Sequence, residues 1–512
     1  MELLLLLAGS LACTALARRF DAPAPLVLVA VGLVVSFAPG VPEFRLDPEL
    51  VLLLVLAPLL YSAALDSSYL DIKANMRPIG LLAVGLVLFT TAVVGVVAHL
   101  LVPGLPLGSA LVLGAVVAPP DAVAAVAIGR KLGLPRRAMT LLTGESLGND
   151  ATALTAFKVA VAGVAAFSWT DGVTTLLVTS IGGVLVGLVL GVAVHAIRLR
   201  LNDGILESAL GLLVPFGAYL LAEEAHTSGV LAVVAAGLYL GHNATQAGFA
   251  TRLQETAVWQ SLDVLLESLV FALIGLQLRT VVSDARPDWD LVAASAGVLL
   301  AVIVSRFVWM FPSAYVPRWL FPHIRRREKN PPGWRQITVI SWAGMRGVVS
   351  LAAAAAIPLD MPGREVVVLL AFVVTVGTLL LQGMTLPALI RGLGIRAEDG
   401  QDRVLAEAQV QDEAARAARA RLDEITAEGN TPRHLTDRLR GLAEHRGNAA
   451  WERLGRQDTE NPAAAFRRVR REMLNAERAV FVAARDRGDI DDEILRRVQR
   501  ELDLEEAALA RN

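Results

Sequence analysis

The chain has 512 residues, 54% of them hydrophobic, and its mean hydropathy of +0.54 is too high for an ordinary water-soluble protein. Its formal net charge is −2, and its charges gather in short loops and after about residue 395, which excludes a nucleic-acid-binding protein. The single cysteine, Cys13, excludes an intrachain disulfide and a cysteine metal site. Repeated apolar segments of about 17–25 residues predict an all-α polytopic membrane protein.

The first apolar segment lacks the basic residues that precede the apolar run of a signal peptide, because Met1-Glu2 leads straight into leucines. Its positive charges, Arg18 and Arg19, follow the run instead. We therefore predict a retained first helix with its N-terminus outside.

Hydropathy predicts about thirteen membrane-spanning segments. They are 2–17, 24–39, 48–65, 79–102, 107–129, 137–167, 172–197, 204–224, 227–243, 256–280, 290–316, 335–357 and 364–394. Between the eighth and ninth, Glu223, Glu224 and His226 mark either a tight turn or a break in one helix. Lys and Arg gather in the loops that this order places inside, above all within 318–335, so the C-terminus is predicted to be cytoplasmic and the membrane to be the plasma membrane.

The composition changes after residue 395, where Ala, Arg, Glu, Asp and Leu dominate. Residues 404–428 and 463–486 read as charged amphipathic helices, and the Gly-Asn-Thr-Pro sequence at 429–432 reads as a break. We predict a transmembrane exchanger domain over 1–395 and a helical cytoplasmic tail over 396–512. The tail is either a simple appendage or a regulatory or dimer-stabilising domain.

The densest polar stretch lies inside the sixth apolar segment, at 143–150, Thr-Gly-Glu-Ser-Leu-Gly-Asn-Asp. In a helix, Ser146 and Asp150 share one face, and Glu145 and Asn149 share the adjacent stripe. An ionisable group at the centre of a membrane helix costs about 2.5–3.5 kcal/mol or more, so such a patch favours a functional site over a satisfied interhelical polar cluster.

The fifth segment is interrupted by Pro119-Pro120-Asp121. Two prolines remove two backbone donors and push the preceding residues out of helical geometry, so the helix should break and free backbone carbonyls and N–H groups. Irregular backbone at that depth is tolerated only where it is buried in protein or lines a wet cavity. With Asp121 at the break, an ion site is favoured over a simple proline kink.

The twelfth segment is interrupted at 342–347, where two glycines flank Arg346. This arginine stays charged, so its burial requires an anionic partner or the C-terminal end of a half-helix. Each interrupted segment is the fifth in a set of six, separated by an odd linker segment. The order predicts two inverted six-helix repeats, with substrate bound where the broken helices meet.

These motifs resemble the monovalent cation/proton antiporter family, specifically its sodium/proton exchanger (NhaP-like) branch of bacterial type. The resemblance is carried by residues 119–123 and 144–150 and by Gly-Met-Arg-Gly at 344–347, with support from 228–238 and 267–276. It covers about residues 1–395. It implies exchange of a monovalent cation, Na⁺ or Li⁺, for H⁺, with no enzymatic activity, no cofactor and a homodimeric assembly that serves pH homeostasis.

The resemblance also implies roles for individual residues. Asp150 and Asp121 would bind the transported Na⁺, with Ser146 and the Pro120 carbonyl as further oxygen ligands. Asn149 would take the place of a second aspartate, and this replacement by asparagine is associated with electroneutral exchange. Glu145 would pair with Arg346 and organise the site.

Two departures concern the ligands. Some relatives have Thr-Asp-Pro where this chain has Pro-Asp-Ala at 120–122, and many carry a glutamate where this chain has Ser62. A third site carboxylate is therefore missing or replaced.

Other charges in the apolar segments support weaker roles. Lys158 either lines the cavity, or faces a glutamate or backbone oxygens, or snorkels to the interface. Arg306 is interpreted as a packing or interface residue toward the cytoplasmic end of its segment. Asp263 and Glu267, four apart, are interpreted as helix–helix structure or funnel lining, with a direct ion role as the alternative.

The mechanism follows from the ligand chemistry. Carboxylates, a hydroxyl and carbonyls are hard oxygen ligands suited to a partly dehydrated alkali ion, and a proton competes for the same carboxylates. Alternating access to a site that holds either species gives obligatory exchange. Exchange of K⁺ for H⁺ is the main alternative because ligand type does not set cavity size. A cation channel and an intramembrane aspartyl hydrolase are the remaining ones.

Overall fold

The computed structural model describes residues 2–39, 48–163, 169–201, 203–285, 287–322, 332–395, 400–427, 432–452, 462–487 and 492–511. It divides into two compact units, Met1–Arg396 and Ala397–Asn512. The structure is 87% helical, with no β-strand among these described residues, which confirms the predicted all-α class. The predicted tail break at 429–431, the end of the sixth segment at 164–167 and the basic residues within 323–331 lie outside the described residues.

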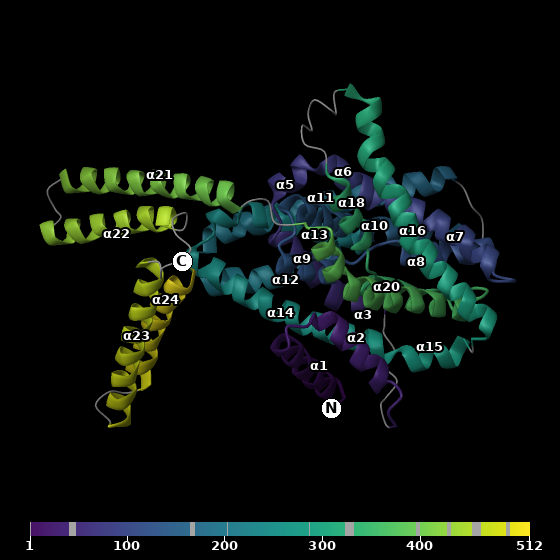
Figure 1. Ribbon diagram of the computed structural model, residues 1–512, viewed down its shortest axis with the longest axis horizontal. Helices are drawn as coiled ribbons and strands as arrows, with labels where there is room; N and C mark the ends of the chain where they lie inside the picture. The colour runs from purple at the N-terminus through teal and green to yellow at the C-terminus, as the bar shows by residue number, and fades with distance from the viewer. Residues whose placement is uncertain are drawn as a thin grey trace. The chain divides into compact units, whose positions relative to one another are not determined.

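The first unit is a bundle of helices (Figure 1). Its elements are α1 Glu2–Arg19, α2 Ala24–Val35, α3 Pro48–Val51, η1 Leu52–Leu56, α4 Ala57–Leu65, α5 Tyr69–Ala74, α6 Met76–Gly80, η2 Leu81–Leu86, α7 Val87–Leu101, α8 Leu107–Val117, α9 Ala122–Leu132, α10 Arg136–Gly163, α11 Trp169–Leu201, α12 Gly204–Glu224, α13 Gly229–His242, η3 Ala244–Gln246, α14 Phe249–Leu276, α15 Leu278–Ala285, α16 Trp289–Leu320, α18 Trp334–Trp342, α19 Val348–Ala355 and α20 Arg364–Gly392.

Seven helical runs among the described residues are long and apolar enough to cross a membrane, and α2, α8 and α13 are shorter apolar helices. Helices suit this environment because each satisfies its backbone groups within itself. Two of the long runs contain a π-helical stretch, η1 and η2. The total of thirteen membrane crossings stays a prediction.

The connection between α12 and α13 is a tight turn, one of the two alternatives that the sequence left open. His226 adopts a left-handed φ of 54°, and Ser228 caps the N-terminus of α13 by accepting a hydrogen bond from the Leu231 N–H at 3.3 Å. The Ser228 N–H in turn donates to the Thr179 carbonyl of α11 at 3.0 Å. These contacts fix where α13 enters the bundle.

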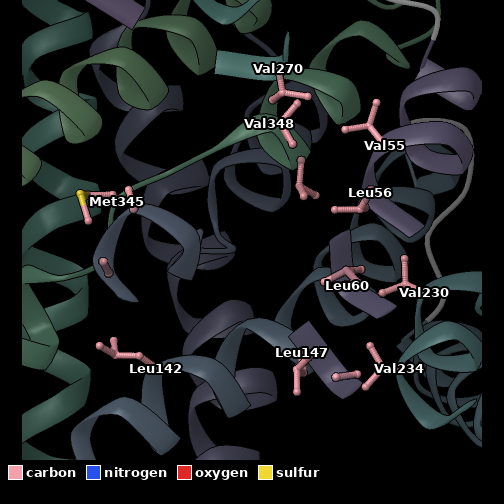
Figure 2. Close-up of a cluster of buried hydrophobic side chains, with 14 of the residues drawn as sticks. Val55, Leu56, Leu60, Leu142, Leu147, Val230, Val234, Val270, Met345 and Val348 are labelled. Carbon is pink, nitrogen blue, oxygen red and sulfur yellow. The ribbon is translucent and has the colours of Figure 1, made fainter. Parts of the chain in front are cut away.

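The apolar core lies between α4, α10, α13 and the interrupted helices. Figure 2 shows Leu60 of α4 facing Val230 of α13, with Leu147 of α10 beside Val234. Close approach of α4 and α13 depends on glycine, because a Cβ at Gly241 would stand 2.5 Å from the Leu65 carbonyl oxygen. This tight packing surrounds the polar residues described below.

The second unit contains α21 Gly400–Ala427, α22 Arg433–Glu452, α23 Pro462–Asp486 and α24 Asp492–Arg511, in two side-by-side pairs (Figure 1). Ion pairs cross the second pair: Arg470 donates to both carboxylate oxygens of Glu505, at 2.7 and 2.9 Å. These hydrogen bonds lower the pKa of the Glu505 carboxyl. The helical character predicted for the tail is therefore present.

Candidate functional site

The two predicted interruptions are confirmed, and they contact each other. α8 ends before the proline pair 119–120, because two residues without an N–H cannot continue the helix. α18 and α19 are separated by residues 343–347. The Asp121 N–H donates to the Met345 carbonyl at 2.7 Å, so a backbone hydrogen bond joins the two breaks directly.

Arg346 reinforces this junction from the α18–α19 break. Its guanidinium is buried, at 1% exposure, and donates to the carbonyls of Val117 (2.8 Å) and Ala118 (3.2 Å) at the C-terminal end of α8. It also donates to the Gly344 carbonyl, and its own N–H donates to Thr378 Oγ1 at 3.0 Å. The charge is thus satisfied by the carbonyls that α8 leaves free, which is one of the two partners that the sequence allowed.

The predicted pairing of Glu145 with Arg346 is wrong. Glu145 forms a two-pronged pair with Arg306 of α16, with N–O distances of 2.5 and 2.7 Å, and each side chain is only 1% exposed. Arg306 Nε donates to the Ile340 carbonyl at 3.2 Å. A Cβ at Gly344 would stand 2.4 Å from Arg306 Cδ, so the absence of a side chain at Gly344 leaves the space that the Arg306 side chain occupies. The planar guanidinium then meets both carboxylate oxygens.

The interpretation of Arg306 as a packing or interface residue is therefore also wrong. It lies close to the midpoint of the 32-residue α16, not at its end. Its neighbours on the same face, Val302 and Met310, are buried. A charge on the buried stripe of a long apolar helix was the signal that could have identified it.

Asp121 caps the second half of the broken helix. Its Oδ1 accepts from the Val123 N–H at 2.8 Å, which satisfies one free donor at the start of α9. Its other oxygen lies over Gly347, where an added Cβ would be only 1.8 Å from Oδ2. Only glycine at this position leaves room for the carboxylate.

Asp150 lies on α10, and its side chain is 4% exposed. Within the described part of the chain it has no hydrogen-bond or ion-pair partner, and its carboxylate interacts electrostatically with that of Asp121. Ser146, one turn earlier on α10, is half-buried. The structure thus places Asp150 near the α8–α9 break with its oxygens uncommitted.

Asn149 ties α10 to the same break. Its side chain is fully buried, and Nδ2 donates to the Pro120 carbonyl at 2.8 Å. That carbonyl, predicted as a cation ligand, keeps one lone pair for a further interaction. Asn149 Oδ1 is buried without a hydrogen-bond partner among the described atoms. The neutral amide holds the break without adding charge.

Ser62 and the α14 carboxylates form a second polar group. Ser62 Oγ donates to Asp263 Oδ2 at 2.7 Å, and Asp263 Oδ1 is buried with no partner in the described structure. Glu267, one turn on, interacts electrostatically with Asp263 and with Asp121. Asp263 of α14 therefore places a carboxylate beside Ser62, the position at which many relatives carry a glutamate.

Lys158 lies outside this group. Its side chain is 64% exposed, and its Nζ is 3.8 Å from Glu223 of α12. Of the alternatives for Lys158, facing a glutamate is the one observed.

Interrupted helices that meet around buried acidic groups are how secondary transporters build ion sites from helix ends and unwound backbone. The first unit accordingly has the architecture of a secondary transporter in a multi-pass membrane protein.

Comparison with known proteins identifies the family. The model of the transmembrane sodium/hydrogen exchanger family matches residues 4–392, and the chain belongs to this family. It is 32% identical to the Na⁺/H⁺ antiporter ApNhaP of Aphanothece halophytica, over 75% of this chain and 72% of that one. It is 32% identical to the sodium, potassium, lithium and rubidium/H⁺ antiporter of Bacillus subtilis, over 72% and 58% of the two chains.

The fold also resembles that of the sodium proton antiporter MjNhaP1 from Methanocaldococcus jannaschii, with a TM-score of 0.61 and 19% identity, over 77% of this chain and 99% of that one. The chain is therefore a transporter of the cation/proton exchanger family and not an enzyme.

Proposed function

We propose that this protein exchanges Na⁺, or Li⁺, for H⁺ by alternating access, with both species competing for Asp150 and Asp121. Ser146 and the Pro120 carbonyl complete the cation's oxygen ligands. The observation that carries the proposal is Asp150 itself: a carboxylate only 4% exposed, uncommitted to any described partner and electrostatically coupled to a second carboxylate.

Competition follows from this charge arrangement. Two neighbouring carboxylates withdrawn from water repel each other, and each lacks the solvation that would stabilise its charge. Binding of an alkali cation or of a proton relieves both costs. If the empty, doubly charged site is costly to reorient, only the cation-bound and proton-bound forms of the protein change access. Each cation that is carried across the membrane in one direction then requires a proton to be carried in the opposite direction.

The other buried polar groups keep the exchange electroneutral. Glu145 is neutralised by Arg306, and Asn149 contributes an amide where a second aspartate would add a charge. Arg346 is committed to the carbonyls of the α8 end. One cation for one proton is then the stoichiometry that leaves the site's charge unchanged.

Potassium is the second candidate cation. ApNhaP is named for Na⁺, whereas the Bacillus subtilis relative is named for Na⁺, K⁺, Li⁺ and Rb⁺ at the same 32% identity. We propose Na⁺ first because carboxylate-rich hard-oxygen sites suit the smaller ion.

The setting of the exchanger is part of the proposal. We place the exchanger domain at 1–395 in the plasma membrane, as a homodimer with its N-terminus outside, and the 396–512 tail in the cytoplasm. The distribution of Lys and Arg supports this orientation.

The test is transport by the purified protein in proteoliposomes that carry a pH gradient, with Na⁺, Li⁺ or K⁺ added outside. We expect Na⁺ and Li⁺ to dissipate the gradient, and Asp150→Asn or Asp121→Asn to abolish the effect in folded protein. Glu223→Gln, a carboxylate outside the site, is the matched control and should stay active. Undiminished Na⁺-dependent flux in Asp150→Asn would refute the site, and flux with K⁺ alone would favour the second candidate.

A further inference from the structure

A second polar cavity lies where the ends of four helices meet, and it shares no residue with the exchange site. It has a volume of about 390 Å³ and is formed by the end of α11, the start of α12, the end of α13 and the start of α14. Its polar lining includes His195, Arg198, Glu207 and Thr251. The volume is within the range of about 300–1,000 Å³ that is typical of small-molecule sites.

Glu207 gives this cavity a negative subsite. Its side chain is 6% exposed, and the only hydrogen bond to the carboxylate in the described structure comes from Thr251 Oγ1, at 2.7 Å. No cationic side chain pairs with it among the described residues. A buried carboxylate with one neutral partner is costly, and a cationic group in the cavity would offset that cost.

Arg198 and the start of α14 form a positive subsite. Arg198 is 8% exposed; Nη2 donates to Glu255 at 2.5 Å, but Nε is buried with no partner in the described structure. Gly248 precedes α14 and supplies no side-chain cap, and among the described residues no side chain caps the first N–H groups of this 28-residue helix, which lie beside the cavity. An uncapped helix N-terminus with an arginine favours an anionic oxygen, such as that of a phosphate.

The rim of the cavity is apolar. Leu199 and Phe249 both line it, and they are 54% and 69% exposed. Both lie at the ends of long apolar helical runs, where such helices emerge from the hydrocarbon of a membrane. Arg200, near the end of α11, and Arg252, near the start of α14, are among the basic residues that the sequence predicts to lie on the cytoplasmic side.

We propose that this cavity binds the headgroup of an aminophospholipid from the adjacent leaflet. The primary ammonium would bind Glu207, and the phosphate would accept from the Arg198 guanidinium and from the first N–H groups of α14. The acyl chains would lie on Leu199 and Phe249. A headgroup that carries both charges matches the two subsites, whereas a purely anionic or quaternary headgroup matches only part of them.

The test is the thermal stability of the delipidated full chain in detergent. Phosphatidylethanolamine, phosphatidylcholine and phosphatidylglycerol with identical acyl chains are added separately, and soluble O-phosphoethanolamine forms a further arm. We expect phosphatidylethanolamine to raise Tm by about 2–4 °C and the other two lipids to raise it by less than about 1 °C. An equal shift with O-phosphoethanolamine would support the headgroup site and identify a soluble ligand as sufficient.

Two variants separate the site from general lipid effects. Glu207→Gln keeps an acceptor for Thr251 but removes the charge, and Ala247→Trp fills the cavity without changing any charge. Both should remain monodisperse and lose the phosphatidylethanolamine response. Glu224→Gln, at the exposed end of the same helix, should keep it. Equal stabilisation by all three lipids, or a full response in both Glu207→Gln and Ala247→Trp, would overturn the proposal.

Discussion

The ion pair between Glu145 and Arg306 can be tested by removing each charge in turn. In Arg306→Met, the Glu145 carboxylate loses two hydrogen bonds of 2.5 and 2.7 Å while remaining 1% exposed. Breaking a buried pair by removing one partner typically costs about 3–5 kcal/mol, because an uncompensated charge stays buried. We expect a loss of this size in the free energy of unfolding.

The double variant Glu145→Met/Arg306→Met is the matched comparison. Replacing both charges by apolar groups of similar volume removes the uncompensated charge, so the double variant should be more stable than Arg306→Met alone. Unfolding is followed in detergent by denaturant titration for the parent, both single variants and the double variant. The difference between the stability lost in the double variant and the sum of the two single losses gives the interaction energy of the Glu145–Arg306 pair.

The same set of single and double variants, with Arg346→Met in place of Arg306→Met, tests which of the two arginines pairs with Glu145. Arg346 donates to backbone carbonyls and interacts with Glu145 only electrostatically, so the coupling energy of Glu145 with Arg346 should be smaller than that with Arg306. Strong coupling of Glu145 to Arg346 and none to Arg306 would refute the pairing described above.

Three further changes test the surroundings of the site and the tail. Gly347→Ala would place a Cβ 1.8 Å from Asp121 Oδ2; it should abolish exchange in proteoliposomes, and wild-type flux would contradict this geometry. Asp263→Asn keeps an acceptor but removes a charge and should raise the cation KM by about two- to fivefold, equivalent to roughly 0.5–1 kcal/mol; an unchanged KM would remove Asp263 from the ion's route. The pKa of Glu505 is lowered by Arg470, so the stability that this pair adds is present above the carboxyl's unfolded pKa and is lost as pH falls through the folded one. After correction for the pH dependence of the intrinsic exchange rate, the protection of α23 and α24 against hydrogen exchange should therefore decrease in that acidic range in the parent but not in Glu505→Gln.

The interruptions could be predicted because their causes are local. Two consecutive prolines break a helix wherever they occur, and two glycines around a buried arginine leave its helix weak. Helical spacing predicted which polar residues of α10 share a face, and the resemblance to the antiporter family supplied the role proposed for each. Asp150, Asp121 and Asn149 accordingly lie around the predicted break.

The partner of Glu145 could not be predicted in this way. Arg306 is 161 residues away in sequence, and its approach depends on how α16 packs and on the space left by Gly344. The Ser62–Asp263 hydrogen bond, across 201 residues, has the same origin. Pairings of this kind are set by tertiary packing, which no single segment encodes.

The hydrogen bond from the Asp121 N–H to the Met345 carbonyl, together with the Arg346 clamp on the end of α8, has a mechanical consequence. These contacts join the α8–α9 break to the α18–α19 break, so neither interrupted helix can tilt without moving the other. The Asn149 amide also joins α10 to the α8–α9 break. In the proposed exchange, an ion held at Asp150 would therefore move together with these joined helices. A change of access would then require this group of helices to move as one body, because the hydrogen bonds between the two breaks oppose bending of one broken helix alone.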